Sequence, residues 1–327
     1  MTAPITRQIL ADKQGLIEAG ALLRAGGLVA FPTETVYGLG ADATNGTAVA
    51  GIYSAKGRPR FNPLIIHVAS LNEAENFALV SPLARLIAEA FWPGPLTLVL
   101  PQRLPSPIAD LALAGLQSIA IRVPSSTIAR DLISASGRPI AAPSANRSGR
   151  VSPTLPAHVL ADLEGRIDAV IMGKAADIGV ESTIVSLLDD KPVLLRPGGV
   201  TRAEIEAVSG LAVTDPELHA SDDAPLAPGM LASHYAPHAT VRLNANEIEK
   251  GEAALLFGSF VPKGCDAARA VFNLSPTGDL KEAAANLFSA LRVLDQSGAP
   301  RIAVVPIPDE GLGEAILDRL RRAAAPR

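Results

Sequence analysis

The chain has 327 residues, of which 48% are hydrophobic and only 4% aromatic, and its formal net charge at neutral pH is -4. That length suits two domains of about 100–200 residues each, with aliphatic cores. The slight acidic excess argues against a protein whose main role is sequence-independent nucleic-acid binding, because such proteins normally carry an excess of basic residues.

The cysteine content and the N-terminal segment bear on the cellular compartment. The single cysteine, Cys265, rules out an intramolecular disulfide and favours a reducing compartment, with a buried, unreactive thiol as its most common role. The N-terminal segment lacks the apolar stretch of a secretory signal, and no apolar run approaches the roughly 20 residues of a membrane span. We therefore expect a soluble, cytoplasmic protein that does not bind membranes.

Helical and extended patterns alternate through the first two-thirds of the chain. Apolar residues at helical spacing, with caps and stops, predict helices at 9–25, from a Thr47 cap to Lys56, at 82–93, 126–136 and 156–165, and from a Thr201 capping box to Gly210. Short apolar runs predict strands at 28–31, 63–68, 96–100, 119–123, 140–142, 169–172, 183–188 and 193–195. Several neighbouring strands lie too close in sequence for a crossover helix, so the sheet should be mixed rather than purely parallel.

A change in composition divides the chain. Residues 213–238 are rich in Pro, Gly and Asp and read as a linker. Beyond them, the pattern predicts a strand at 253–257, a helix at 279–295, a strand at 302–305 and a final helix at 311–324. We therefore expect an α/β protein with a first domain at 1–212, a linker at 213–238, and a small Rossmann-like domain at 239–327.

The usual cofactor signatures are absent from the sequence. Met172-Gly-Lys174 lacks the hydroxyl residue and the upstream glycine of a Walker A loop, and no G-x-G-x-x-G follows a strand. The five histidines do not have zinc-binding spacing. We expect no metal site built from protein side chains.

Polar side chains instead gather at the ends of apolar runs. The strand at 28–31 leads into Phe31-Pro-Thr-Glu-Thr-Val-Tyr-Gly-Leu-Gly40, and Lys56, Arg58 and Asn62 precede the strand at 63–68. A density of donors beside a strand suits phosphate oxygens. The alternative is a solvated helix end, because cations are common in the last turn of a helix.

Other candidates are weaker when taken singly. Arg122 lies in an apolar strand, where it could form an ion pair on the sheet or bind a carboxylate; the sequence leaves both open. Arg196 ends another strand, and His67 follows Leu64-Ile-Ile and could be an ordinary core histidine. Their shared position at strand ends favours one pocket, because open α/β sheets bind ligands there.

Eight segments together resemble the YrdC-type threonylcarbamoyl-AMP synthases, in the long form with an added C-terminal domain. They are FPTETVYGLGADA (31–43), KGRPRFNPLIIHV (56–68), WPGPLTLVL (92–100), IAIRVP (119–124), APSANRSGRVSPT (142–154), ESTIVSL (181–187), LLRPGG (194–199) and APGMLASHYAP (227–237). Residues 239–327 are similar only in forming a small Rossmann-like domain.

The resemblance implies a nucleotidyltransferase with a YrdC-like first domain. Its reaction would convert L-threonine, bicarbonate and ATP to threonylcarbamoyl-AMP and pyrophosphate, with Mg²⁺ bound through the ATP phosphates. The product would serve a downstream threonylcarbamoyl transferase complex that modifies an adenosine in tRNA. Carried over by position, the threonine-binding residues are Thr35, His67, Arg122, Ala142 and Ser182. The ATP-binding residues are Lys56, Arg58, Asn62, Ser118, Ser144, Asn146, Val151, Arg196 and Tyr235, with Lys56 and Arg58 also catalytic.

Two other functions remain open at this stage. A YrdC-like domain could be an RNA-binding module, although the acidic balance and scarce aromatic residues favour weak or no nucleic-acid binding. The chain could also be a carbamoyltransferase that uses carbamoyl phosphate, similar to the hydrogenase-maturation enzymes. Those enzymes carry zinc-finger and acylphosphatase segments before the YrdC-like unit, whereas this chain starts at that unit.

Overall fold

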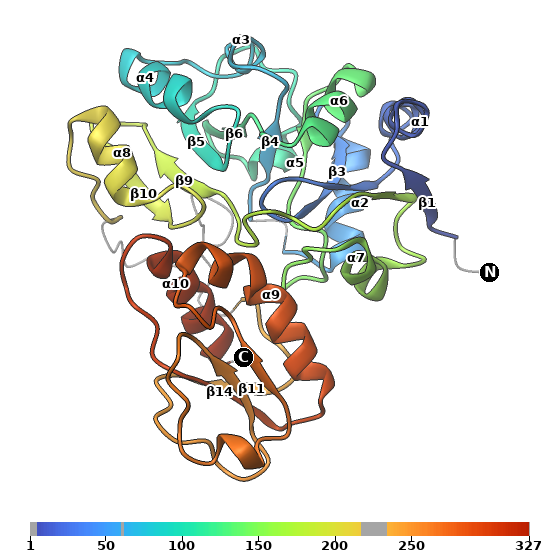
Figure 1. Cartoon of the computed structure of the whole chain (residues 1–327). Helices are drawn as coiled ribbons and strands as arrows, with labels where there is room; N and C mark the ends of the chain where they lie inside the picture. The colour runs from blue at the N-terminus through green and yellow to red at the C-terminus, as the bar shows by residue number, and fades with distance from the viewer. Residues whose placement is uncertain (1–4, 60–61, 217–233, 327) are drawn as a thin grey trace.

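A computed structural model describes residues 5–59, 62–216 and 234–326 (Figure 1). These residues form a ten-stranded sheet and a separate four-stranded sheet. The strands are β1 Arg7–Leu10, β2 Val29–Pro32, β3 Tyr37–Asp42, β4 Ile65–His67, β5 Leu96–Pro101, β6 Ser118–Arg122, β7 Ile140–Ala141, β8 Ala169–Met172, β9 Thr183–Ser186, β10 Val193–Arg196, β11 Thr240–Arg242, β12 Ala253–Leu256, β13 Val271–Asn273 and β14 Arg301–Val304.

The helices lie between these strands. They are α1 Lys13–Arg24, α2 Gly46–Lys56, α3 Leu71–Ala74, α4 Pro82–Phe91, α5 Asp110–Leu113, α6 Thr127–Ser136, α7 Pro156–Leu163, α8 Arg202–Ser209, α9 Leu280–Gln296 and α10 Leu312–Ala324, with a 3₁₀ turn at Cys265–Ala267. Within the described parts of the chain, none of these helices is long and apolar enough to span a bilayer.

The large sheet has the strand order β1-β8-β2-β3-β7-β4-β6-β5-β9-β10. The sheet contains parallel pairs such as β4–β6 and β5–β9 and antiparallel pairs such as β2–β3 and β5–β6. The expected mixed sheet is therefore confirmed. Its pairing brings β4, β6 and β9 together although more than 100 residues separate the first from the last along the chain.

Both faces of the large sheet are buried. Side chains alternate along each strand, so successive residues pack into clusters on opposite faces. In β2, Val29 and Phe31 pack into a cluster with α1 and α6, whereas Ala30 joins the larger cluster on the opposite face. Burial on both faces explains the continuous apolar run that preceded the site in the sequence.

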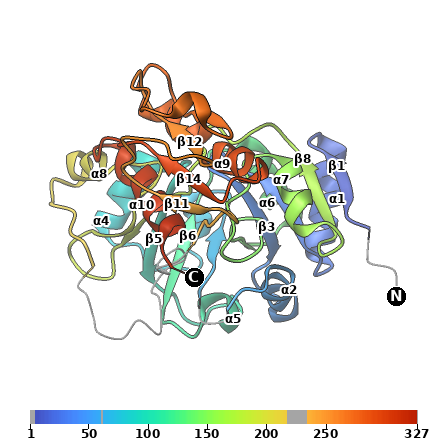
Figure 2. The ribbon, with the colours of Figure 1, turned by 90° about the horizontal axis from the view of Figure 1, so that it is seen from below.

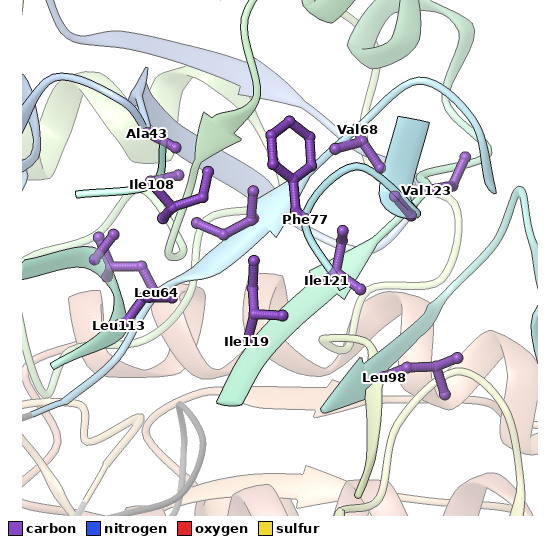
Figure 3. Close-up of a cluster of buried hydrophobic side chains, with 14 of the residues drawn as sticks. Ala43, Leu64, Val68, Phe77, Leu98, Ile108, Leu113, Ile119, Ile121 and Val123 are labelled. Carbon is purple, nitrogen blue, oxygen red and sulfur yellow. The ribbon is translucent and has the colours of Figure 1, made fainter. Parts of the chain in front are cut away.

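The larger cluster supports the strands that carry the site. Figure 3 shows Leu64 and Val68, which flank β4, in one cluster with Phe77 and with Ile119 and Ile121 of β6. Because the pleat alternates, Arg122 then faces the other side of the sheet. The core therefore determines which face of β6 presents its cation.

The small sheet is parallel, in the order β11-β14-β12-β13. Helices α9 and α10 lie between it and the large sheet (Figure 1). Figure 2, seen from below, shows the small sheet and these helices in front of the large sheet. Their apolar residues form one cluster with Val36, Val151 and Val180 from the first part of the chain. The two parts of the molecule therefore share a packed boundary.

Most of the predicted elements are confirmed, including the Thr201 capping box and the end of α4 before Pro93. The predicted linker at 213–238 is described only at its ends, because residues 217–233 lie outside the described part of the chain. Cys265 is buried, as expected.

Several predictions of secondary structure were wrong. Residues 7–10 form strand β1, and the first helix begins only at Lys13, after an Asp12 cap. The cap of α2 is Asn45 rather than Thr47, because the Asn45 side chain accepts hydrogen bonds from two backbone amides of the first turn.

Strands β3, β11 and β13 were not predicted. The glycines in β3 have low strand propensity, so the sequence pattern did not predict a strand there. The fold requires one of them: a Cβ at Gly40 would lie 2.8 Å from the Phe31 ring and 2.9 Å from Ile140. Tertiary packing, rather than propensity, therefore makes this segment a strand.

Candidate active site

A small cavity lies between β4, β6, the start of β9 and the segment 234–235, and it encloses about 50 Å³. Ligand pockets usually measure about 300–1,000 Å³, so this space is too small for a nucleotide together with an amino acid. The predicted site residues that line it are Thr35, Arg58, His67, Arg122, Ala142, Ser144, Ser182, Arg196 and Tyr235.

One end of the cavity is built around Arg122. Strands β4 and β6 pair in parallel with His67 opposite Arg122, which places both side chains on the same face. Arg122 donates to Thr35 Oγ1 at 3.0 Å and to Glu34 Oε1 at 2.6 Å, and it is only 3% exposed. Of the two roles left open by the sequence, the ion pair is observed, and Arg122 also borders the cavity.

His67 is a neutral group at this end. Burial, together with the nearby Arg122 charge, lowers the pKa of its imidazole to about 3. Its Nδ1 lies 3.2 Å from the carbonyl of Ile65 on the same strand. A neutral ring can donate or accept one hydrogen bond without adding charge.

The other end of the cavity is cationic. Lys56 is the last residue of α2, which Gly57 ends in a left-handed conformation with φ of +63°. The Lys56 ammonium donates to the carbonyl of Ser144 at 2.6 Å and to the carbonyl of Asn146. Burial lowers its pKa well below the usual range, and the charge of Arg58 lowers it further. The ammonium is therefore held in place but poorly solvated.

Two arginines complete the cationic end. Arg58 donates to the carbonyls of Asn62 at 3.4 Å and Pro63 at 3.0 Å, and burial lowers its pKa to about 10. Arg196, at the end of β10, donates to the carbonyl of Ser182 at 3.1 and 2.9 Å and to its hydroxyl at 3.2 Å. Backbone oxygens thus orient both guanidinium groups toward the cavity.

Lys56 does not line the small cavity but borders a second, more open cavity of about 550 Å³. Val151 lines this second cavity, together with the cations Arg147, Arg150 and Arg292. The Ser144 carbonyl that holds Lys56 belongs to a residue that lines the small cavity, so this second cavity, here called the basic opening, lies next to the cationic end.

The remaining predicted site residues, Asn62, Ser118 and Asn146, are buried but line neither of these two cavities. Asn146 accepts from the Ser144 hydroxyl at 2.6 Å and donates to the carbonyls of Arg147 and Arg150, both at 2.8 Å. These bonds fix the loop whose carbonyls hold Lys56.

Sequence reasoning missed three ionisable residues at or beside the cavity. Glu181 and His234 line it, and Glu34 lies behind it as the partner of Arg122. The carboxyl of Glu181 is held ionised: burial alone would raise its pKa, but Arg319 and Arg196 lower it overall. A signal existed, since both glutamates immediately precede a predicted threonine-site residue, Thr35 or Ser182.

Tyr235 closes the cavity from the C-terminal side. Its ring is fully buried and stacks on Phe288 of α9, with 5.5 Å between ring centroids. The backbone of Tyr235 has a φ of +60°, which is uncommon for a residue with a side chain. Such conformations cluster at functional sites.

Comparisons with known proteins show the family of the chain. Residues 21–198 match the Sua5, YciO and YrdC family model, described as telomere recombination, and residues 200–325 match the C-terminal domain of threonylcarbamoyl-AMP synthase. The threonylcarbamoyl-AMP synthase of Bacillus subtilis is 42% identical over 99% of this chain and 96% of its own. That of Pyrococcus abyssi is 45% identical over 94% of both chains. The crystal structure of P. abyssi Sua5 complexed with L-threonine superposes with a TM-score of 0.88, at 41% identity over 98% of this chain and 97% of that one.

Proposed function

The chain belongs to the threonylcarbamoyl-AMP synthase family, and we propose that it converts L-threonine, bicarbonate and ATP to threonylcarbamoyl-AMP and pyrophosphate. The single observation that carries the proposal is the cavity itself. It places a buried arginine and hydroxyl groups at one end and a cluster of cations at the other. These ends match an amino acid and a polyphosphate.

We propose that threonine binds at the Arg122 end, through Thr35, His67, Arg122, Ala142 and Ser182. All five border the cavity, which supports the assignment. A guanidinium is well suited to the substrate carboxylate. The Thr35 and Ser182 hydroxyls and the neutral His67 ring can bond the amine and hydroxyl of threonine without repelling its ammonium group.

We propose that ATP binds at the cationic end. Arg58, Ser144, Arg196 and Tyr235 border the small cavity, and Lys56 and Val151 border its basic opening. Asn62, Ser118 and Asn146 are assigned to the nucleotide by family resemblance alone. The basic opening suits the phosphates that lie farthest from threonine.

The reaction needs no protein nucleophile. The threonine amine forms a C–N bond with bicarbonate, which loses water to leave a carbamate. A carbamate oxygen then bonds to the α-phosphorus of ATP. The bond from that phosphorus to the bridging oxygen breaks, and pyrophosphate leaves with the electron pair. Lys56 and Arg58 would stabilise the charge that builds on the leaving oxygens.

We propose that Mg²⁺ enters with ATP, held by the phosphates. The described residues contain no cluster of three or more His, Cys, Asp or Glu side chains suited to a metal ion. The Glu181 oxygens already accept bonds from Ser152 and Arg319. A metal ion carried by its substrate would offset charge on the phosphate oxygens.

We propose three functional parts: a catalytic domain at 1–212, a linker at 213–238 that serves as a lid, and a Rossmann-like domain at 239–327 that anchors the lid. The stacking of Tyr235 on Phe288 supports the anchor. The size of the cavity supports the lid, because ATP needs more room than the segment 234–235 leaves. A closed lid would protect the labile carbamate and adenylate from water.

We propose that the protein acts in the cytoplasm and passes its product to a downstream transferase complex that modifies adenosine in tRNA. We expect weak or no direct RNA binding, because the net charge is -4. A salt titration of tRNA binding, measured beside turnover, tests that expectation.

The deciding experiment incubates the full-length protein with ATP, L-threonine, bicarbonate and Mg²⁺, and measures pyrophosphate together with the mass of the adenylate. We expect pyrophosphate only when all three substrates are present. Pyrophosphate release without threonine would contradict the assignment. Activity with carbamoyl phosphate in place of bicarbonate and ATP would instead favour the carbamoyltransferase.

A further inference from the structure

Arg319 of helix α10 is the largest fully buried side chain in the described residues. A guanidinium keeps its charge at any physiological pH, so its burial is costly unless partners compensate it. Arg321, two residues along the same helix, is 57% exposed at its side chain and pairs with Asp309 near the surface. The burial of Arg319 is therefore specific to its face of the helix.

The main partner of Arg319 lies in the catalytic part of the chain. Its Nε donates to Glu181 Oε2 at 2.8 Å, across 138 residues of sequence. A second nitrogen donates to Asp318 Oδ2 at 2.6 Å, within α10. The Arg319–Glu181 pair thus joins the last helix of the C-terminal unit to the wall of the cavity.

Glu181 connects Arg319 to the cationic end of the cavity. Its other oxygen accepts from the Ser152 hydroxyl, which fixes the carboxylate from the opposite side. The next residue, Ser182, offers the carbonyl that orients Arg196 at 2.9 Å. Displacement of Glu181 would therefore move the Ser182 carbonyl that orients the Arg196 guanidinium.

Arg319 also contacts the segment that closes the cavity. Its guanidinium carbon lies 5.3 Å from the centroid of the Tyr235 ring, within the range of a cation–π contact. Phe288 of α9 stacks on the same ring. Two helices of the C-terminal unit thus hold Tyr235, and Arg319 links it to Glu181 in the cavity wall.

We propose that Arg319 is a positioning residue for nucleotide transfer, which holds Glu181 and Tyr235 in the geometry that the ATP end requires. The inference deepens the proposed function and rests on it. Arg319 acts through other side chains and lies outside the residues that border the cavity. The C-terminal unit then contributes to the chemistry through a residue that does not itself border the cavity.

The test compares full-length variants in which this contact is changed. Arg319→Met removes the charge and keeps much of the volume, and Arg321→Met on the exposed side of α10 is the matched control. Glu181→Gln and the double variant R319M/E181Q report whether Arg319 acts through Glu181. Arg319→Lys keeps the buried charge but lacks the planar guanidinium with its several donors. This variant replaces R319M in the test if R319M does not fold.

The readouts are kcat, KM for ATP and for threonine from pyrophosphate release, and threonine binding by calorimetry. We expect R319M to raise the KM for ATP about tenfold and to lower kcat about 10- to 100-fold, as small misplacements of reacting groups do. Threonine affinity should change by less than about threefold, because Arg319 does not contact the Arg122 end. R321M should match the wild type, and R319M/E181Q should lose no more than R319M, since coupled residues are not additive.

Three results would overturn the inference. Normal kinetic constants in both R319M and R319K would show that the contact is dispensable. If kcat and the number of threonine molecules bound per protein fall together while the KM for ATP is unchanged, the substitution has only reduced the amount of folded protein. Additive losses in R319M/E181Q would exclude action through Glu181. Wild-type protein that releases no pyrophosphate would overturn the proposed function, and this inference with it.

Discussion

The two ends of the cavity are built in different ways. The Arg122 end is assembled within the large sheet, where strand register sets His67 beside Arg122 and a carboxylate, Glu34, neutralises the cation. The cationic end gathers Lys56, Arg58 and Arg196 from a helix end, a loop and another strand, and the bonds described for them run mainly to backbone oxygens.

This difference suggests that one end of the cavity determines the affinity for threonine and the other determines the rate of adenylate formation. An ion-paired arginine on a paired strand is fixed before any ligand arrives, which favours selective binding of one carboxylate. At the other end, the cations bond to neutral carbonyl oxygens, which do not cancel positive charge as a carboxylate does, so that charge can attract phosphate. We therefore expect substitutions at the Arg122 end to act on threonine affinity and substitutions at the other end to act on turnover.

The largest effect should come from Lys56→Ala or Arg58→Ala. Each should lower the rate of adenylate formation about 10²- to 10³-fold, because removal of one preorganised donor typically has that effect on a transition state. Threonine affinity should be nearly unchanged. Pyrophosphate release and calorimetry measure the two quantities, with Lys13→Ala on the exposed side of α1 as the control. Near-normal turnover would mean that Lys56 is only a helix-end cation.

The Arg122 end should give a smaller effect of the opposite kind. Arg122→Leu would leave Glu34 buried without a partner, so we would make it in a Glu34→Gln background and compare it with E34Q alone. Threonine affinity should fall about 100-fold, as when one partner of a buried charged contact is lost. Affinity for an ATP analogue, measured by the same calorimetry, should stay within about threefold. Equal losses for both ligands would make Arg122 a structural residue.

The pH dependence of ATP binding should sharpen the contrast. Burial lowers the pKa of Lys56, so its ammonium is lost at a lower pH than that of an ordinary lysine. Phosphate binds the charged form, and ATP affinity should therefore fall, by at most about tenfold per pH unit, as the pH rises through that lowered pKa. Lys56→Arg, which stays charged, should remove the dependence. Threonine affinity over the same range serves as the internal control.

The lid should contribute less than the cations. Tyr235→Phe keeps the ring that stacks on Phe288 and removes only the hydroxyl. If that hydroxyl bonds the nucleotide, the KM for ATP should rise up to about tenfold, the usual effect of one hydrogen bond. Tyr235→Ala should cost more, since the stacking is lost as well. Identical kinetics for Y235F and wild type would leave the ring as the only functional part.

The smallest effect concerns stability in acid. Burial lowers the pKa of His67 to about 3, so the unfolded chain binds this proton more readily than the folded one. His67 thus favours unfolding progressively as the pH falls from about 6.5 to 3. Chemical denaturation across that range should show a shallower loss of stability for His67→Gln. An unchanged slope would mean that another buried group, such as His234, dominates.

The sequence by itself determined most of the elements and many of the residues at the candidate site. Periodicity, caps and prolines were enough for most helices and for the buried strands, because these signals act within a few residues. The motifs around Thr35, Lys56, Ser144 and Arg196 named residues that border the cavity or its opening, since polar groups at strand ends are visible in the chain itself.

Tertiary structure alone decided which groups meet. Glycine-rich β3 became a strand through its packing on Phe31, against its own propensity. The ion pair of Glu34 with Arg122 and the bond of Glu181 to Arg319 each span more than 80 residues of sequence. No local pattern encodes such pairs, because they depend on strand register and on the docking of α10, which only the folded chain defines.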